Sequence, residues 1–437
     1  MRRVWPSVRV YPCAARFECT NGGETVTRRL ITGYAEGVKS PSRAPVVGVI
    51  GGGQLARMMA PEASELGISL RVLAESPEVC AAQVVPDSPV GEYTDLETLR
   101  DFARESDVLT FDHEHVPTPH LDALMADGVA VNPRPEALVH AQDKIEMRRA
   151  VDRLGLPNPL WEAVTTPEQL RAFGQRAGWP VVLKTPRGGY DGKGVMLVDE
   201  QSVDSAEVLE WFEKAVQAGW TDGALLAEEK VEFSRELSAL VARRPEGESR
   251  AWDVAESIQV DSVCNEVIVP APNLAPDIAE SARRAALTIA SELGVTGVMA
   301  AELFETPGRG PGFLINELAM RPHNSGHWTQ DGSVTSQFEQ HLRAVLDLPL
   351  GSTDRVAEAT VMKNVLGGEN QNLYGALPEV MAEYPEAKVH LYGKSVRPGR
   401  KVGHVNVTGP SESMDRLRQV ANEAAAVIRD HGAAENA

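Results

Sequence analysis

Two apolar runs that flank a turn rich in proline and glycine constrain the fold of this 437-residue chain more than any other feature. The runs cover 298–304 and 312–315, and the turn between them covers 306–312. Apolar runs on either side of such a turn predict an antiparallel β-hairpin. If the register of this hairpin is symmetric about the turn, Glu302 lies opposite Glu317.

The predicted pairing of Glu302 with Glu317 has a chemical consequence. Two carboxylates directly opposite each other on one sheet face repel and destabilise the strand pair. A bound cation removes that repulsion, and carboxylates that also meet phosphate oxygens commonly hold magnesium. The hairpin therefore predicts a metal site, with charges splayed into water as the alternative. The segment 316–328, with an arginine and two histidines, continues the second strand and predicts a functional site there.

A second predicted strand pair encloses a glycine-rich loop. The runs 181–185 and 195–198 predict strands, and the loop 186–194 between them has four glycines within seven positions. Glycines let a backbone approach an anion and aim its N–H groups at phosphate oxygens. The spacing differs from that of a Walker loop. Lys184 shares a strand face with Val182, so it can reach a phosphate as a point charge, although a flexible turn is the alternative for the loop.

The segment that begins at Val46 predicts a doubly wound sheet. The apolar run 46–50 is followed by Gly51-Gly52-Gly53-Gln54-Leu55-Ala56, a helical run to Leu66, and the apolar run 70–73 with Glu75. This G-x-G-x-x-A pattern is typical of the Rossmann fingerprint for dinucleotides. It leaves an NAD-dependent oxidoreductase as the alternative function.

A further apolar run, 108–111, ends in Asp112-His113-Glu114-His115. These residues fall at the carboxyl edge of the predicted sheet, where open α/β sheets bind ligands. The mixture of acids and histidines suggests zinc, but no third ligand follows at a recognisable spacing. We therefore expect Glu114 to face a substrate and the two histidines to make local contacts, with a structural role for all four as the alternative.

Composition excludes several classes of function. The 62 Asp and Glu against 43 Lys and Arg give a net charge of −19, which argues against a nucleic-acid-binding protein. No apolar stretch approaches the roughly 20 residues that cross a membrane. The four cysteines lack metal-type spacing and indicate a reducing compartment. We therefore expect a cytoplasmic protein with no nucleic-acid and no membrane partner.

The last part of the chain predicts a small terminal domain. It has a strand-like run at 359–366 and, from Met414, apolar residues at helical spacing. Between them lies the basic segment 394–401. Guanidinium groups bind phosphate oxygens in pairs, so this segment suits a phosphate group, with a solvated loop as the alternative. Further upstream, the periodicity of 136–154 predicts a helix that carries Lys144.

These motifs resemble those of a known family. The loop 188–194, Asn316-Glu317, 323–328 and 397–404 are similar to those of the N5-carboxyaminoimidazole ribonucleotide synthetases. These are ATP-grasp carboxylases of purine biosynthesis, the ATPase subunit of phosphoribosylaminoimidazole carboxylase. The resemblance extends from about residue 46 to about residue 410. Its last two motifs separate this family from other ATP-grasp enzymes, whereas the first two indicate only the superfamily.

The resemblance implies a fold that combines α/β and α+β parts. An extension at 1–43, disordered or translated from a start codon placed too far upstream, would precede an N-terminal doubly wound, Rossmann-like domain at 44–141. A central ATP-grasp domain at 142–353 and a small C-terminal domain at 354–437 would follow. The implied substrates are ATP, bicarbonate and 5-aminoimidazole ribonucleotide, with two magnesium ions for which manganese substitutes. A homodimer is also implied, and a protein that binds nucleotide without turnover is a further alternative.

The resemblance also implies roles for individual residues. Backbone groups of 228–231 would bind adenine, Glu236 would bind the ribose, and Gln259 stands where the family has a histidine. Lys144 would contact the nucleotide, with an ordinary exposed lysine as the alternative. The residues implied for ATP are Lys144, Lys184, Gly189, Tyr190, Asp191, Gly192, Lys193, Gly194, Val195, Glu228, Glu229, Lys230, Val231, Glu236, Gln259, Asn316 and Glu317.

A second group of residues is implied for the ribonucleotide and for catalysis. Those for the ribonucleotide are Gln54, Leu55, Glu114, Tyr190, Asp191, Lys394, Arg397, Arg400 and Lys401. Those for catalysis are Arg321, His323, Asn324 and Lys193, and the metal ligands are Glu302 and Glu317.

The segment 1–43 differs from the remainder in charge, with eight Lys and Arg against three Glu. It lacks the apolar core of a signal peptide and the amphipathic periodicity of an organellar transit peptide. We therefore interpret it as a disordered extension or as the result of a start codon placed too far upstream, and exclude it from the predicted fold. Deleting residues 1–43 should leave the melting temperature and the catalytic activity nearly unchanged, as measured by thermal unfolding and steady-state kinetics beside the full chain. Loss of soluble protein would instead show that the segment packs on the folded body.

Overall fold

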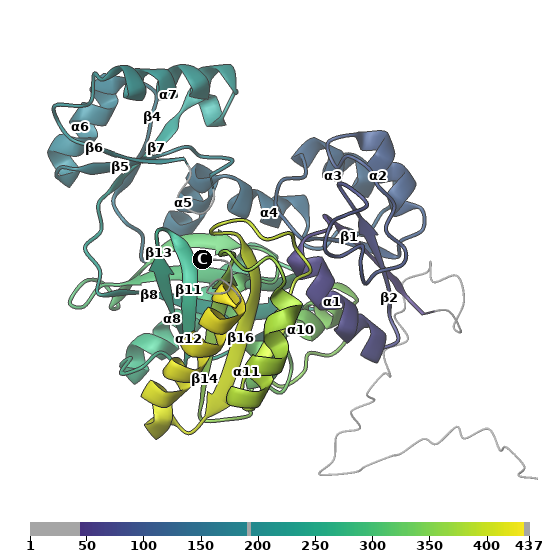
Figure 1. Ribbon diagram of the computed structural model, residues 1–437. Helices are drawn as coiled ribbons and strands as arrows, with labels where there is room; N and C mark the ends of the chain where they lie inside the picture. The colour runs from purple at the N-terminus through teal and green to yellow at the C-terminus, as the bar shows by residue number, and fades with distance from the viewer. Residues whose placement is uncertain (1–43, 190–193, 432–437) are drawn as a thin grey trace, which may run out of the picture. The chain divides into compact units, whose positions relative to one another are not determined.

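The computed structural model describes residues 44–189 and 194–431, and the chain divides into a unit at 1–43 and a unit at 44–437 (Figure 1). Tyr190, Asp191, Gly192 and Lys193, all predicted site residues, lie outside the described residues. Within the described ranges, no helix is both long and apolar enough to cross a bilayer.

The N-terminal part is a parallel sheet in the order β2-β1-β3, as its apolar runs predict. One face of the sheet packs on helices α2 and α3, and the other packs on α1 and on α10 (Gln337–Val345). Parallel sheets are covered on both faces, which explains why every residue of β1 is buried. The elements are β1 (Val46–Ile50), α1 (Gln54–Glu65), β2 (Ser69–Leu73), α2 (Leu96–Ala103), β3 (Val108–Phe111) and α3 (Thr118–Ala126).

The single helix predicted over 136–154 is instead two helices, α4 (Pro135–Gln142) and α5 (Lys144–Arg153). Asp143 separates them because its backbone is extended and its carboxylate caps α5, accepting hydrogen bonds from the N–H groups of Ile145 and Glu146. Aspartate favours this capping position over a helix interior. The break places Lys144 in the first turn of α5, beside the functional cavity described below.

A smaller antiparallel sheet has the order β4-β7-β5-β6. The predicted strands on either side of the glycine-rich loop are confirmed as β5 and β6, which pair with each other. The helices α6 and α7 cover this sheet (Figure 1). The elements are β4 (Trp161–Val164), α6 (Pro167–Ala177), β5 (Val181–Lys184), β6 (Val195–Val198), α7 (Ala206–Gln217), the 3-10 turn Thr221–Gly223 and β7 (Leu225–Glu229).

The largest sheet is antiparallel, in the order β13-β12-β8-β10-β11-β14-β16-β15, with β9 paired to β8. Its strands come from both sides of residue 353, so the predicted terminal segment continues this sheet, and the domain boundaries stay a prediction. The strands are β8 (Arg235–Arg243), β9 (Ser249–Ala251), β10 (Ala255–Val260), β11 (Val263–Val269), β12 (Gly297–Glu305), β13 (Phe313–Ala319), β14 (Ala359–Leu366), β15 (Lys388–Leu391) and β16 (Lys401–Gly409).

Helices cover both ends of this sheet. The helix α8 packs on β8 and β12, and α10 packs on the same two strands. The amphipathic helix predicted from Met414 is confirmed as α12, which packs on β14 and β16. The bounds are α8 (Pro276–Glu292), α9 (Thr329–Gly332), α10 (Gln337–Val345), α11 (Leu377–Glu383), α12 (Met414–Asp430), and the 3-10 turns Asn324–Gly326, Leu373–Ala376 and Ser411–Ser413.

The register predicted for the hairpin of β12 and β13 is confirmed. Glu302 pairs with Glu317, and the next pair is Leu303 with Ile315, so the register shifts by one residue at Asn316. Such a β-bulge adds one residue to a strand and redirects the side chains beside it. The bulge therefore lies at the residues that the sequence predicts for a metal site.

Candidate functional site

A cavity of about 1090 Å³ is lined by residues of the N-terminal part, of the smaller sheet and of the β12–β13 hairpin. Much of the predicted site meets there. The predicted residues that line it are Gln54, Leu55, Glu114, Lys144, Lys184, Gly189, Val195, Glu228, Glu229, Lys230, Val231, Glu236, Gln259, Glu302, Asn316, Glu317, Arg321, His323, Asn324 and Lys401.

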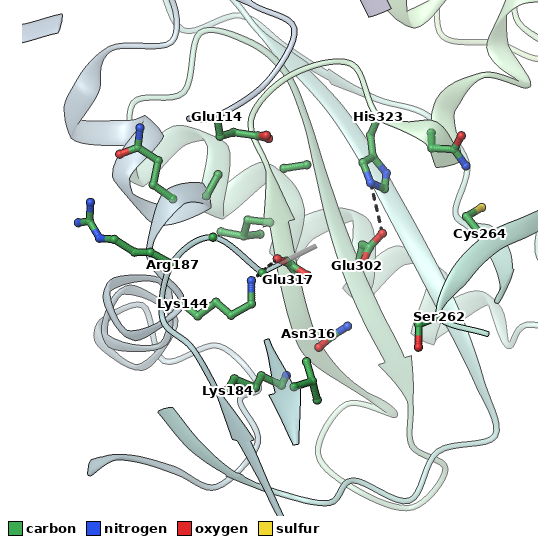
Figure 2. A pocket seen from close by; sticks show the side chains of 18 of the residues that line it. Glu114, Lys144, Lys184, Arg187, Ser262, Cys264, Glu302, Asn316, Glu317 and His323 are labelled. Carbon is green, nitrogen blue, oxygen red and sulfur yellow. Dashed lines mark hydrogen bonds and ion pairs between the residues drawn. The ribbon is translucent and has the colours of Figure 1, made fainter. Parts of the chain in front are cut away.

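The bulge in β13 explains how two consecutive residues reach one cavity. Successive side chains of a regular strand point to opposite faces, whereas Asn316 and Glu317 both line the cavity (Figure 2). The extra residue at the bulge breaks this alternation. An amide and a carboxylate thereby stand beside Glu302 of the neighbouring strand.

The two paired carboxylates differ in their neighbours and in the direction of their pKa shifts. Lys144 Nζ lies 2.6 Å from Glu317 Oε1, and His323 Nε2 lies 3.3 Å from Glu302 Oε1 (Figure 2). Although the Glu302 side chain is partly exposed to the cavity, loss of solvation by the surrounding protein raises its pKa to about 8, and the negative charges of Glu317 and Glu236 add to this shift. For Glu317, burial would also raise the pKa, but the positive charges of Lys144, Lys184 and Arg148 together lower it.

This donor set fits a hard divalent cation. Two carboxylates and the amide of Asn316 offer oxygen ligands. The raised pKa of Glu302 shows that its ionised form is disfavoured, and a bound cation would remove that cost. Among the described residues, no group of three or more His, Cys, Asp and Glu is arranged to hold a metal by itself. Phosphate oxygens and water would therefore complete the coordination, which is usual for magnesium with a nucleotide.

A buried ion-pair network holds the lysine predicted to bind phosphate. Lys184 Nζ lies 2.5 Å from Glu228 Oε2, and Arg148 Nε lies 2.5 Å from Glu228 Oε1. Burial alone would raise the pKa of Glu228, but the two cations lower it to about 2. The side chain of Glu228 is thus committed within the protein. Sequence reasoning missed Arg148, whose partners Glu228 and Ile315 lie 80 and 167 residues away.

The wall near Glu236 carries the residues predicted for the nucleoside. Burial raises the pKa of Glu236, and a hydrogen bond with Gln259 opposes this shift. Gln259 Nε2 also donates to Ser257 Oγ at 2.9 Å. The carboxylate of Glu229 accepts a hydrogen bond from Arg309 Nη1 at 2.9 Å. The N–H of Glu229 is also paired within the protein, since it donates to the Leu160 carbonyl at 2.9 Å.

The motif that follows β13 is held by side chains from other segments. Arg321 Nε donates to Glu114 Oε2 at 2.7 Å. The Gln337 amide accepts the His323 N–H and donates to the His323 carbonyl, both at 2.8 Å. Ser325 Oγ lies 2.8 Å from His323 Nδ1. Gln337 was also missed, because only the tertiary fold brings α10 against this motif.

The His323 ring is neutral in this environment. Burial lowers the pKa of His323 to about 3, and the positive charges of Arg321 and Lys401 contribute to the shift. A neutral imidazole keeps one ring nitrogen as an acceptor and the other as a donor. His323 can therefore orient a ligand through hydrogen bonds but supplies no positive charge near neutral pH.

The basic segment 394–401 is only partly at the cavity. Lys401 lines it, and Lys394 Nζ contacts the amide oxygen of Gln54, another lining residue. The cavity lining does not include Arg397 and Arg400, which are exposed. The Arg400 guanidinium donates instead to Ser395 Oγ at 2.8 Å. Gly194, in the glycine-rich loop, is likewise outside the lining.

The dinucleotide hypothesis fails at its own fingerprint. A pyrophosphate would need the free N–H groups at the start of α1. The Asp112 carboxylate already accepts hydrogen bonds from the N–H groups of Gly53 at 2.7 Å and Ala56 at 3.0 Å. A Glu75 oxygen accepts the Gly52 N–H at 3.1 Å. The glycine turn is therefore closed by the protein's own acids, and the oxidoreductase alternative has no support.

Comparisons with protein families agree with this geometry. Residues 45–142 match the ribonucleotide synthetase preATP-grasp domain, and residues 149–338 match the ATP-grasp domain. Residues 360–419 match the phosphoribosylaminoimidazole carboxylase C-terminal domain.

Individual proteins are similar over most of the chain. The N5-carboxyaminoimidazole ribonucleotide synthase of Mycobacterium tuberculosis is 51% identical over 369 residues, 84% of each chain. The protein of that name from Corynebacterium ammoniagenes is 48% identical, over 85% of this chain and 89% of its own. An Aspergillus clavatus N5-carboxyaminoimidazole synthase, solved with ADP and 5-aminoimidazole ribonucleotide, is 30% identical with a TM-score of 0.77, covering 88% of this chain and 98% of its own.

The protonation of Glu302 predicts that metal binding depends on pH. A carboxyl group with a pKa of about 8 must lose its proton to bind a cation, so metal affinity should rise between pH 7 and pH 9 by about tenfold and then level off. Titration with Mn²⁺, followed by electron paramagnetic resonance, would measure this. Glu302→Gln should bind Mn²⁺ weakly at every pH, whereas Glu232→Gln, a change at an exposed acid on the cavity rim, should behave as the wild type. A flat pH profile in the wild type would contradict the assignment.

Proposed function

The chain belongs to the N5-carboxyaminoimidazole ribonucleotide synthase family, whose reaction is the ATP-dependent carboxylation of 5-aminoimidazole ribonucleotide in purine biosynthesis, and we propose that bicarbonate supplies the carboxyl group through carboxyphosphate. One observation carries the proposal. The cavity brings the paired carboxylates, the lysine beside the glycine-rich loop and the arginine–histidine motif together in one space. ADP, phosphate and N5-carboxyaminoimidazole ribonucleotide are the products.

The ATP half of the site comprises the smaller sheet and the hairpin. Lys184 and Lys144 offer positive charge to the phosphates, and the glycine-rich loop offers backbone N–H groups. The backbone of 228–231 faces the adenine edge, and Glu236 accepts hydrogen bonds from the ribose hydroxyls. In this arrangement catalysis of phosphoryl transfer comes from positioning and charge neutralisation.

Magnesium would be held by Glu302 and Glu317, with the Asn316 amide beside them. Its chemistry there is to neutralise charge on the phosphate oxygens as the γ-phosphoryl group moves. Two ions with manganese as a substitute, a homodimer and a cytoplasmic location are further parts of this proposal, supported by family resemblance.

The second half of the site handles the two acceptors. A bicarbonate oxygen attacks the γ-phosphorus of ATP, and ADP leaves, which produces carboxyphosphate. The exocyclic amine of the ribonucleotide then attacks the carboxyl carbon of this intermediate, with phosphate as leaving group, or attacks the carbon dioxide that carboxyphosphate releases together with phosphate. In either case the amine nitrogen loses a proton. Arg321 offers charge to the anionic intermediate, while the neutral His323 and Asn324 orient it by hydrogen bonds. Glu114, which holds Arg321, faces the ribonucleotide.

The direct test is ADP release by the purified protein supplied with ATP, magnesium, bicarbonate and 5-aminoimidazole ribonucleotide. We expect ADP release that requires the ribonucleotide and yields its carboxylated product. Glu317→Gln should fold and lose nearly all turnover, because one of two paired ligands becomes neutral. Nucleotide binding without turnover in the wild type would contradict the proposed reaction, and near-normal turnover in Glu317→Gln would contradict the metal assignment.

The basic segment generates a separate prediction for the ribonucleotide phosphate. Arg400 precedes the cavity residue Lys401, and its guanidinium could pair with phosphate oxygens. Arg400→Ala should raise KM for the ribonucleotide and leave KM for ATP nearly unchanged. A lost charged hydrogen bond costs about 1.5–3 kcal/mol, which corresponds to roughly 10- to 150-fold.

Steady-state kinetics with each substrate varied in turn would check this prediction. Arg416→Ala, which removes an exposed arginine of α12, is the matched control and should leave both KM values unchanged. An equal rise in KM for ATP and for the ribonucleotide would place the phosphate site elsewhere.

A further inference from the structure

The Arg148 guanidinium is fully buried and binds three separate segments of the chain. Its Nε donates to Glu228 Oε1 at 2.5 Å. Its Nη1 donates to the Ile315 carbonyl at 2.6 Å and to Asn158 Oδ1 at 2.9 Å. Its Nη2 donates to the Asn316 carbonyl at 2.9 Å. One side chain of α5 therefore touches both the smaller sheet and the β12–β13 hairpin.

Toward the smaller sheet, Arg148 acts on the phosphate lysine through Glu228. Glu228 Oε1 binds Arg148, and Glu228 Oε2 binds Lys184. Because Arg148 and Glu228 are both buried, the carboxylate is held in one orientation. That orientation determines where the Lys184 ammonium group stands.

Toward the hairpin, Arg148 binds the backbone of the bulge itself. A bulge leaves one residue of a strand unpaired with its neighbour. Arg148 donates to the carbonyls of Ile315 and of Asn316, the extra residue of the bulge. These contacts stabilise the backbone conformation that turns Asn316 and Glu317 into the cavity.

We propose that Arg148 is a positioning residue that holds Lys184 at a set distance from Glu317, and so aligns the phosphate-binding lysine with the carboxylate pair. The inference rests on the proposed ATP site. Only arginine suits the position, because its planar fork directs five N–H groups at acceptors in different directions. A lysine there keeps the charge but has one nitrogen, so it can satisfy the carboxylate or the bulge, but not both.

The test compares Arg148→Lys with Arg149→Lys. Arg149 is the adjacent residue of the same helix, and its partner is Glu146 on the helix surface. In Arg148→Lys we expect kcat/KM for ATP to fall by about tenfold or more, with KM for the ribonucleotide within about twofold of the wild type. Mn²⁺ affinity of the ADP complex, measured by electron paramagnetic resonance, should fall by a similar factor. Arg149→Lys should match the wild type throughout.

A second variant separates the contact of Arg148 with Glu228 from its contacts with the bulge carbonyls. Glu228→Gln releases Lys184 but leaves Arg148 on the bulge carbonyls. It should therefore weaken ADP binding, measured by calorimetry, while Mn²⁺ affinity of the nucleotide complex stays near that of the wild type. All measurements are made below the melting temperature of each variant, which thermal unfolding determines.

Three outcomes would overturn the inference. One is wild-type affinity for ADP and Mn²⁺ in folded Arg148→Lys. Another is that Arg148→Lys lowers kcat/KM for ATP and for the ribonucleotide by the same factor, which would indicate a general structural role. The third is that Glu228→Gln loses as much Mn²⁺ affinity as Arg148→Lys does. Since ADP and Mn²⁺ binding need no turnover, these outcomes differ from a failure of the proposed function, which would appear as absent ADP release in the wild type.

Discussion

The structure of the site depends on carboxylates that are wholly or partly withdrawn from water, each of which requires a cation or a proton. Glu228 has Arg148 and Lys184, Glu317 has Lys144, and Glu114 has Arg321. Burial raises the pKa of Glu302 to about 8, the charges of two other acids add to this shift, and the histidine beside it is neutral. Because a buried charge without a partner is costly, this imbalance marks the place where a cation would bind.

The cation partners also connect parts of the fold. Arg148 and Lys144 both lie on α5. Arg148 binds the smaller sheet and the bulge, and Lys144 binds Glu317. A short helix thereby sets the geometry between two sheets. The break at Asp143 is part of this arrangement, because it begins α5 at Lys144. Electrostatic pairing and local capping thus act together at the cavity.

Hydrogen bonds from distant segments orient Arg321 and His323, the groups that we propose face the acceptors. Gln337 holds both backbone groups of His323, and Glu114 holds Arg321. Such contacts keep reactive groups in one geometry before substrate arrives, which is the main source of rate enhancement in sites that rely on preorganised charge. The neutral state of His323 has the same origin, since burial and neighbouring cations both lower its pKa.

The sequence by itself determined the strands, the glycine-rich hairpin and the pairing of Glu302 with Glu317, because alternation of apolar residues and turn composition are local signals. Family motifs extended this to most of the cavity lining. Tertiary structure alone decided that α4 and α5 are separate, that Arg148 and Gln337 serve the site, and that Arg397 and Arg400 lie outside the cavity lining. These outcomes depend on which distant groups meet a side chain, and on how far burial shifts its pKa, and neither is encoded in spacing along the chain.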